Sequence, residues 1–163
     1  MAKLSTKKIA RAGVIAALYV VLSLITFPVA SGSIQFRLSE GLTLLPLIMP
    51  ESIIALFIGC MLSNIITGCM ILDVLFGSLI TLLAGILTFF IGKIIKNKSL
   101  KYVASGLFPV LLNAFFLPVI WYFCYGQLEY LYILQVAFLL ISQTVSVYAF
   151  GVPLCVFIEK RKL

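Results

Sequence analysis

The sequence predicts an all-α integral membrane protein in which six transmembrane helices form one compact domain over residues 1–163. The composition is the first reason: 63% of the 163 residues are hydrophobic and 10% are charged, whereas soluble domains have about 45–50% and about 25%. The second reason is a series of long apolar runs, because a helix needs about 20 apolar residues to cross a bilayer. The third is that the basic residues lie in short clusters between these runs, as they do in membrane proteins.

The first two spans are expected over residues 9–30 and 35–49. The first follows a basic N-terminal segment and resembles a signal peptide, but further spans follow at once, so we expect it to be retained. The second is short. Pro46 lies inside it and Pro50 ends it, and because proline interrupts the hydrogen bonds of a helix, we expect this span to be bent or broken.

Four further spans are expected over residues 51–68, 74–95, 102–123 and 133–158. Glu51 opens the third span, in which small side chains recur every four residues. Small side chains let two helices approach closely, so we expect tight packing along this stripe. Its members are Ala55, Gly59, Ser63 and Thr67.

The basic residues predict how the spans are oriented. Six spans put both termini on the same side, and eleven of the twelve lysines and arginines share that side, which the positive-inside rule makes the cytoplasm. They are Lys3, Lys7, Lys8, Arg11, Lys93, Lys96, Lys98, Lys101, Lys160, Arg161 and Lys162. The exception, Arg37, lies at the outer mouth with Asp73 and Glu129. The net charge of +7 does not indicate nucleic-acid binding, since that requires a basic face on a soluble domain.

Arg37 and Glu40 are the most distinctive polar pair. They stand at positions i and i+3, so in a helix they share one face, and ionisable groups in or beside a membrane span are candidates for function. We expect Glu40 to be the main ligand-recognising carboxylate, kept ionised by the charge of Arg37. We expect Asp73 to lie in a water-exposed turn and to contribute less. The alternative is an ion pair that only anchors the end of a helix.

Other polar and aromatic residues accompany this pair. Together they offer hydrogen-bond donors, acceptors and stacking rings to an outward-opening cavity, which suits a flat, polar heteroaromatic ligand. The expected ligand-binding residues are Gln35, Arg37, Glu40, Asn64, Asp73, Asn113, Trp121 and Gln143, with Tyr122 and Tyr125 as further rings. The alternatives are that the amides only join helices and that the aromatic residues form an interfacial belt.

The sequence lacks the residues for several chemistries. It has no histidine, and its four cysteines form no C-x-x-C motif, so we expect neither a metal site nor a cofactor. Without a G-x-x-x-x-G-K-[ST] motif the chain cannot hydrolyse ATP itself, and without a nucleophile motif or a histidine base we do not expect an enzyme. Cys69 and Cys124 both fall near outer helix ends, so a disulfide between them stays open.

The first span carries a strip of small residues near its cytoplasmic end. Ala12 and Ala16 form one small-x-x-x-small pair, and Gly13 and Ala17 form a second beside it. Such a strip can take a helix of a partner protein or a neighbouring helix of the same bundle. The pattern favours neither.

The order of the spans, the Ala12-x-x-x-Ala16 strip and above all the run IQFRLSEGLTLLPL at residues 34–47 resemble the QueT family. Members of this family are substrate-binding S components of energy-coupling factor (ECF) transporters. The resemblance covers essentially the whole chain. One departure is Gly41, where family members often have alanine, and it leaves the polar pattern intact.

The resemblance implies uptake of a queuosine precursor, a 7-deazaguanine such as preQ1 or queuine, across the plasma membrane of a bacterium. It also implies three partner proteins: a transmembrane coupling subunit, for which the strip of the first span is the docking face, and two ATPase subunits. Two alternatives stay open. One is an S component for another vitamin-like molecule, and the other is an autonomous carrier or channel, although no matched pair of broken helices is visible.

Overall fold

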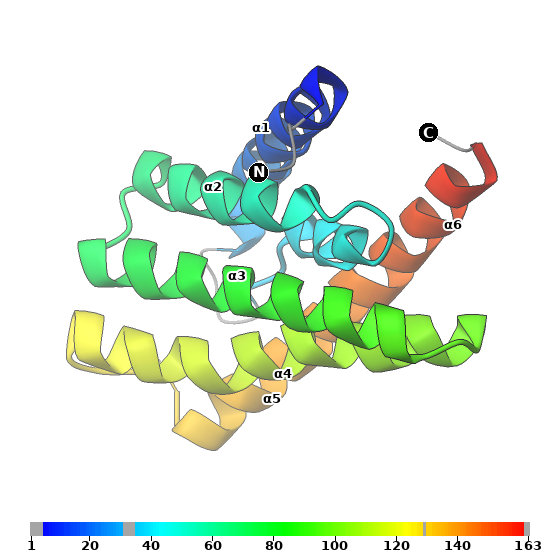
Figure 1. Cartoon of the computed structure of the whole chain (residues 1–163). Coiled ribbons are helices and arrows are strands. Elements are labelled where there is room, and N and C mark those ends of the chain that lie inside the picture. The colour runs from blue at the N-terminus through cyan, green and yellow to red at the C-terminus, as the bar shows by residue number, and fades with distance from the viewer. Residues whose placement is uncertain (1–4, 31–34, 129, 162–163) are drawn as a thin grey trace.

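The computed structural model describes residues 5–30, 35–128 and 130–161, and all regular elements within these ranges are helices (Figure 1). The predicted outer connection over residues 31–34 and the charged residues Lys3, Glu129 and Lys162 lie outside these ranges. In chain order the elements are α1 (Thr6–Ala30), η1 (Leu38–Leu47), α2 (Ser52–Ile66), α3 (Ile71–Ile94), α4 (Lys98–Tyr125), α5 (Tyr132–Thr144), η2 (Val145–Gly151) and α6 (Val152–Arg161).

Four helices in the described part of the chain are long and apolar enough to cross a membrane. They are α1, α3, α4 and the continuous helix formed by α5, η2 and α6. These helices coincide to within a few residues with the first, fourth, fifth and sixth predicted spans, and in each case the helix is long and apolar enough to cross a membrane. The prediction for the third span is confirmed only as a shorter helix, because α2 has 15 residues. The total of six spans and the cytoplasmic position of the termini stay predictions.

The predicted second span is a ten-residue 3₁₀ helix, η1. At a rise of about 2.0 Å per residue it covers about 20 Å, which is less than the roughly 30 Å of a bilayer core. The expected interruption is confirmed, but an α-helical span over residues 35–49 is wrong. Arg37 is in an extended conformation, and Pro46 stands inside η1 without an N–H to donate, so an α-helix does not run through the segment.

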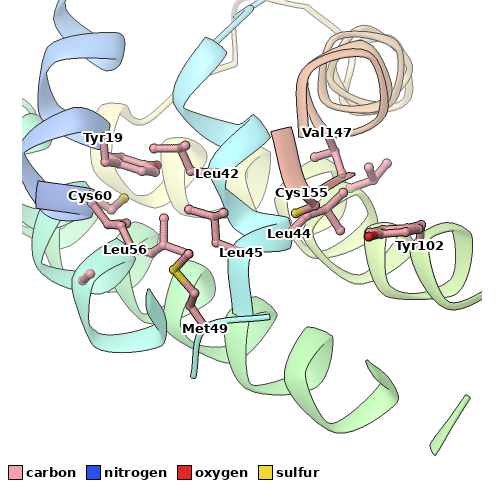
Figure 2. Close-up of a cluster of buried hydrophobic side chains, with 13 residues drawn as sticks. Tyr19, Leu42, Leu44, Leu45, Met49, Leu56, Cys60, Tyr102, Val147 and Cys155 are labelled. Carbon is pink, nitrogen blue, oxygen red and sulfur yellow. The ribbon is translucent and has the colours of Figure 1, made fainter. Parts of the chain in front are cut away.

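The core of the protein is built around η1. Its residues 39–46 are all buried, and it contacts α1 and α2 on one side and η2 and α6 on the other. Figure 2 shows Leu42 and Leu45 on the side of Tyr19. It shows Leu44 on the opposite side, next to Val147 and Cys155. A short helix surrounded by others in this way needs apolar side chains toward its neighbours, which its leucines provide, and its buried polar groups Ser39, Glu40 and Thr43 take part in hydrogen bonds.

Glycines allow unusually close approaches between helices at two places. A Cβ at Gly151, in the π-helical turn η2, would lie 2.5 Å from the carbonyl oxygen of Gly41 in η1. A Cβ at Gly59 in α2 would lie 2.8 Å from the Cβ of Tyr19 in α1. The prediction of close packing along the small-residue stripe of the third span is therefore confirmed at Gly59, where only hydrogen fits.

The chain runs back and forth, so the helix ends gather at two opposite ends of the bundle (Figure 1). At one end, Arg11 Nη1 lies 3.5 Å from Glu51 Oε1, and Lys98 Nζ lies 2.7 Å from Glu159 Oε2. These pairs join the start of α1 to the start of α2 and the start of α4 to the end of α6. We call this the basic end. The opposite end, where α1, α2 and α4 finish and α3 and α5 begin, we call the cavity end.

Candidate functional site

A cavity of about 400 Å³ opens at the cavity end of the bundle. This volume is within the range of about 300–1,000 Å³ that is usual for small-molecule sites. Its wall combines the last turns of α1, α2 and α4, the first turns of α3 and α5, and the extended segment before η1. Five of the eight residues expected to bind ligand lie in this wall: Gln35, Arg37, Asn64, Asp73 and Trp121.

Asp73 corrects one expectation from the sequence. It does not lie in a water-exposed turn: it belongs to the first turn of α3, its residue is 4% exposed, and it lines the cavity. The turn is displaced because α3 begins at Ile71, three residues before the predicted start. A carboxylate in the first turn of a helix is stabilised by the helix dipole, so this buried position is compatible with a charged group.

Asn64 and Asp73 converge over Gly77. A Cβ at Gly77 would lie 3.4 Å from both Asn64 Nδ2 and Asp73 Oδ1. The glycine therefore leaves room for an amide and a carboxylate to lie close together beside the cavity. Trp121 and Cys69 lie close to the same carboxylate, so Asp73 has polar and aromatic neighbours from α2, the turn after it and α4.

Two residues before η1 complete the polar wall. Gln35 has a φ of 48°, a left-handed conformation that non-glycine residues rarely adopt and that is found preferentially at binding sites. Arg37 is half-buried and interacts through space with both Asp73 and Glu40. Within the described residues, however, no ion pair joins Arg37 to Glu40. The expected pair is present as an electrostatic interaction and not as a contact.

Glu40 lies deeper than the cavity and does not line it. Both of its oxygens already accept hydrogen bonds: Oε1 from the Tyr19 hydroxyl at 2.8 Å and Oε2 from Asn113 Nδ2 at 2.9 Å. Asn113 Nδ2 also donates to Gln143 Oε1 at 3.2 Å. Glu40, Asn113 and Gln143 thus form a buried network with Tyr19 behind the cavity. This arrangement fits a carboxylate that joins helices, and it differs from the alternative of an ion pair that only anchors the end of a helix.

The aromatic residues divide between the cavity and the surface. Trp121 is 8% exposed and lines the cavity, whereas Tyr125 is half-exposed and lies at its rim. Tyr122 is 54% exposed and does not belong to the wall. Trp121 is therefore a buried ring in the cavity wall, and the exposed Tyr122 fits the interfacial belt.

Several residues of the wall were not predicted from the sequence. They include Ser23, Phe27, Thr67, Gln127, Leu128 and Gln135. Gln135 is the most informative, since it is 2% exposed and its Oε1 has no hydrogen-bond partner among the described residues. One signal was present in the sequence: Gln135 stands seven residues, or two helical turns, before Ser142, so the two share a face.

The strip of small residues on α1 divides into an inner and an outer half. Ala12 and Ala16 pack against the hydrophobic core, and the carbonyl oxygen of Ala16 lies 3.0 Å from the position of a Cβ on Gly59. Gly13 and Ala17 are exposed, and a Cβ at Gly13 would meet no described atom within 4 Å. The outer half is the part of the strip that is free to contact another helix.

The four cysteines are free thiols, so Cys69 and Cys124 form no disulfide in this structure. Within the described ranges, no three cysteine, aspartate or glutamate side chains gather in a group that could hold a metal ion.

Comparison with known proteins gives one result. No curated protein and no solved structure matches the chain. The family model described as QueT transporter matches residues 9–160, which is nearly the whole chain. Membership of a transporter family also agrees with the apolar helices and with the ligand-sized cavity lined by polar groups. The protein is therefore a membrane protein that belongs to the QueT transporter family, the S components of ECF transporters.

Proposed function

We propose that this protein captures a queuosine precursor, a 7-deazaguanine such as preQ1 or queuine, in the cavity at its cavity end. The observation that carries the proposal is the position of Asp73. This buried carboxylate faces a cavity of about 400 Å³ together with Asn64 and the indole of Trp121. A flat ring that is rich in N–H groups needs an acceptor at its edge and an aromatic face above it, and these three residues supply both.

The proposed chemistry is complementary hydrogen bonding combined with stacking. A 7-deazaguanine presents N–H donors and a carbonyl acceptor along one edge. Asp73 accepts from N–H donors, and a hydrogen bond to a charged acceptor is stronger than a neutral one. Arg37 or a side-chain amide of the wall meets the carbonyl, and Trp121 stacks on the ring.

Transport requires an orientation and a source of energy. We place the basic end in the cytoplasm of a bacterium and the cavity end outside, because the positive-inside rule puts clustered lysines and arginines in the cytoplasm. The energy comes from two ATPase subunits through a transmembrane coupling subunit. The exposed half of the α1 strip, Gly13 and Ala17, lies toward the basic end and gives that subunit a flat surface to pack against.

Isothermal titration of the purified protein in detergent tests the substrate class. We expect preQ1 or queuine to bind and adenine, which lacks the carbonyl and the 2-amino group, to bind much more weakly or not at all. Equal affinity for adenine, or no heat of binding with either precursor, would contradict the proposal. Uptake by proteoliposomes should require the coupling subunit and the ATPases, and uptake by this protein alone would indicate an autonomous carrier.

A further inference from the structure

Gln135 is the one glutamine of the cavity wall whose buried acceptor has no partner within the described residues. It lies in the first turn of α5, where its backbone N–H donates to the carbonyl oxygen of Leu131 at 3.0 Å. The backbone is thus satisfied while the side-chain Oε1 is not. Burying an acceptor without a donor costs free energy, so such an atom calls for an explanation.

Gln143 provides the comparison inside the same helix. Both glutamines are buried, at 2% and 1% exposure. Gln143 Oε1 accepts a hydrogen bond from Asn113 at 3.2 Å, and Gln143 does not line the cavity. Gln143 is therefore an internal connector between helices, whereas Gln135 combines an unpaired acceptor with a position in the cavity wall.

The chemistry of the primary amide defines what can satisfy Gln135. A side-chain amide presents an acceptor oxygen beside a donor nitrogen, so its best partner is a group that presents a donor beside an acceptor. A cyclic amide has this arrangement, with a ring N–H next to a ring C=O. A carboxylate offers acceptors only, so Asp73 cannot bind both atoms of such an edge.

We propose that Gln135 is the specificity-determining residue that reads the cyclic-amide edge of the ligand. Its Oε1 accepts the ring N–H and its Nε2 donates to the ring carbonyl, which leaves the exocyclic amino group of the ligand to Asp73. This inference rests on the proposed function, since it identifies which amide of the wall meets the carbonyl of a 7-deazaguanine. It predicts that the site prefers rings with a carbonyl at this position to rings with an amino group there.

The experiment uses the full chain in detergent and two probes, 7-deazaguanine and its analogue 2,6-diamino-7-deazapurine, in which an amino group replaces the carbonyl. We expect the wild type to prefer 7-deazaguanine. Gln135→Leu should weaken that binding by about tenfold or more. Because the acceptor that it removes is unpaired in the free protein, it should leave the midpoint of thermal unfolding unchanged or raised. Gln135→Glu, which accepts but does not donate, should shift the ratio of the two affinities by about tenfold toward the diamino analogue.

Gln143→Leu is the matched control, because it removes the same amide from the same helix but breaks the bond to Asn113. It should lower the thermal midpoint. Wild-type affinity and preference in Gln135→Leu, or a drop in its thermal midpoint equal to that of Gln143→Leu, would overturn the inference and make Gln135 structural. If Gln135→Glu does not fold, Gln135→Met takes its place and should lose the preference for the carbonyl. Failure of the wild type to bind either probe would instead refute the proposed substrate class, and the inference with it.

Discussion

Asn113 donates from Nδ2 to Glu40 Oε2 across 2.9 Å, and this bond joins α4 to η1 over a separation of 73 residues in the sequence. On its other side the Glu40 carboxylate accepts from Tyr19 of α1. The short helix η1 is thus held by polar bonds to two long helices that also form the cavity. The residues of this network do not line the cavity, but they connect the helices that form its wall.

Removal of Asn113 from this network should destabilise the protein. Asn113→Leu deprives the buried Glu40 carboxylate of a donor and Gln143 of its partner, and a loss of this kind costs about 1–3 kcal/mol, or more for a charged group. We expect a lower midpoint of thermal unfolding in detergent. Ser99→Leu, at an exposed position near the start of the same helix, should leave the midpoint nearly unchanged. A midpoint for Asn113→Leu equal to that of this control would show that the network carries no stability.

The two carboxylates should respond differently to the loss of charge. Asp73→Asn replaces an acceptor in the cavity wall by a donor, and leaving ligand N–H groups unpaired costs about 1–3 kcal/mol, or about tenfold to a hundredfold in affinity. Glu40→Gln changes a group that does not line the cavity and should mainly lower the thermal midpoint. Calorimetry with preQ1 and queuine measures both variants. A larger loss of affinity in Glu40→Gln than in Asp73→Asn would instead support the sequence-based prediction that Glu40 is the main ligand-recognising carboxylate.

Substitutions on the two halves of the α1 strip distinguish packing within the bundle from docking of the coupling subunit. Gly13→Trp adds a ring on the exposed side of α1 and should retain ligand binding and thermal stability while blocking uptake by the assembled transporter. Ala16→Trp forces a ring toward the core beside Gly59, and overpacking of this kind costs about 1–3 kcal/mol, so stability, binding and uptake should fall together. Normal uptake by a stable Gly13→Trp protein would place the coupling subunit on another surface.

Membrane topology can be read from cysteine accessibility in a variant that lacks the four native cysteines. A cysteine at position 127, an exposed site near the cavity, should react with an impermeant maleimide added to intact cells. A cysteine at position 98, at the basic end, should react only after the membrane is permeabilised. The reverse pattern would mean that the cavity faces the cytoplasm, and import from outside would be untenable.

The sequence was sufficient for the long helices and for much of the cavity. α1 and α4 follow from the lengths of their apolar runs, since a helix is the conformation in which a single segment satisfies its own backbone hydrogen bonds in a bilayer. Asn64, Asp73 and Trp121 meet in one cavity because polar groups in apolar helices turn toward the inside of a bundle. Arg37 was recognised because it is the one basic residue that the predicted topology places at the outer side.

The remaining features depend on contacts between distant segments. The role of Glu40 is decided by Tyr19 and Asn113, which lie 21 and 73 residues away, and no local pattern reports such partners. The 3₁₀ helix η1 contains Pro46, and at Gly41 it packs closely against the distant segment η2. Gln135 stands near the predicted start of a span, where a polar residue is ordinary. Its shared face with Ser142 does not indicate a cavity, and its unpaired buried oxygen is what distinguishes it in the structure.

The central claim is that the cavity holds a 7-deazaguanine, and native mass spectrometry of the purified protein tests it most directly. The protein is expressed in bacteria supplied with preQ1 and queuine, and the bound small molecule is released and identified. We predict a 7-deazaguanine bound in equimolar amount to the wild-type chain and greatly depleted in Asp73→Asn. An unrelated small molecule in equimolar amount, or no bound 7-deazaguanine in wild-type protein from supplemented cells, would contradict the account.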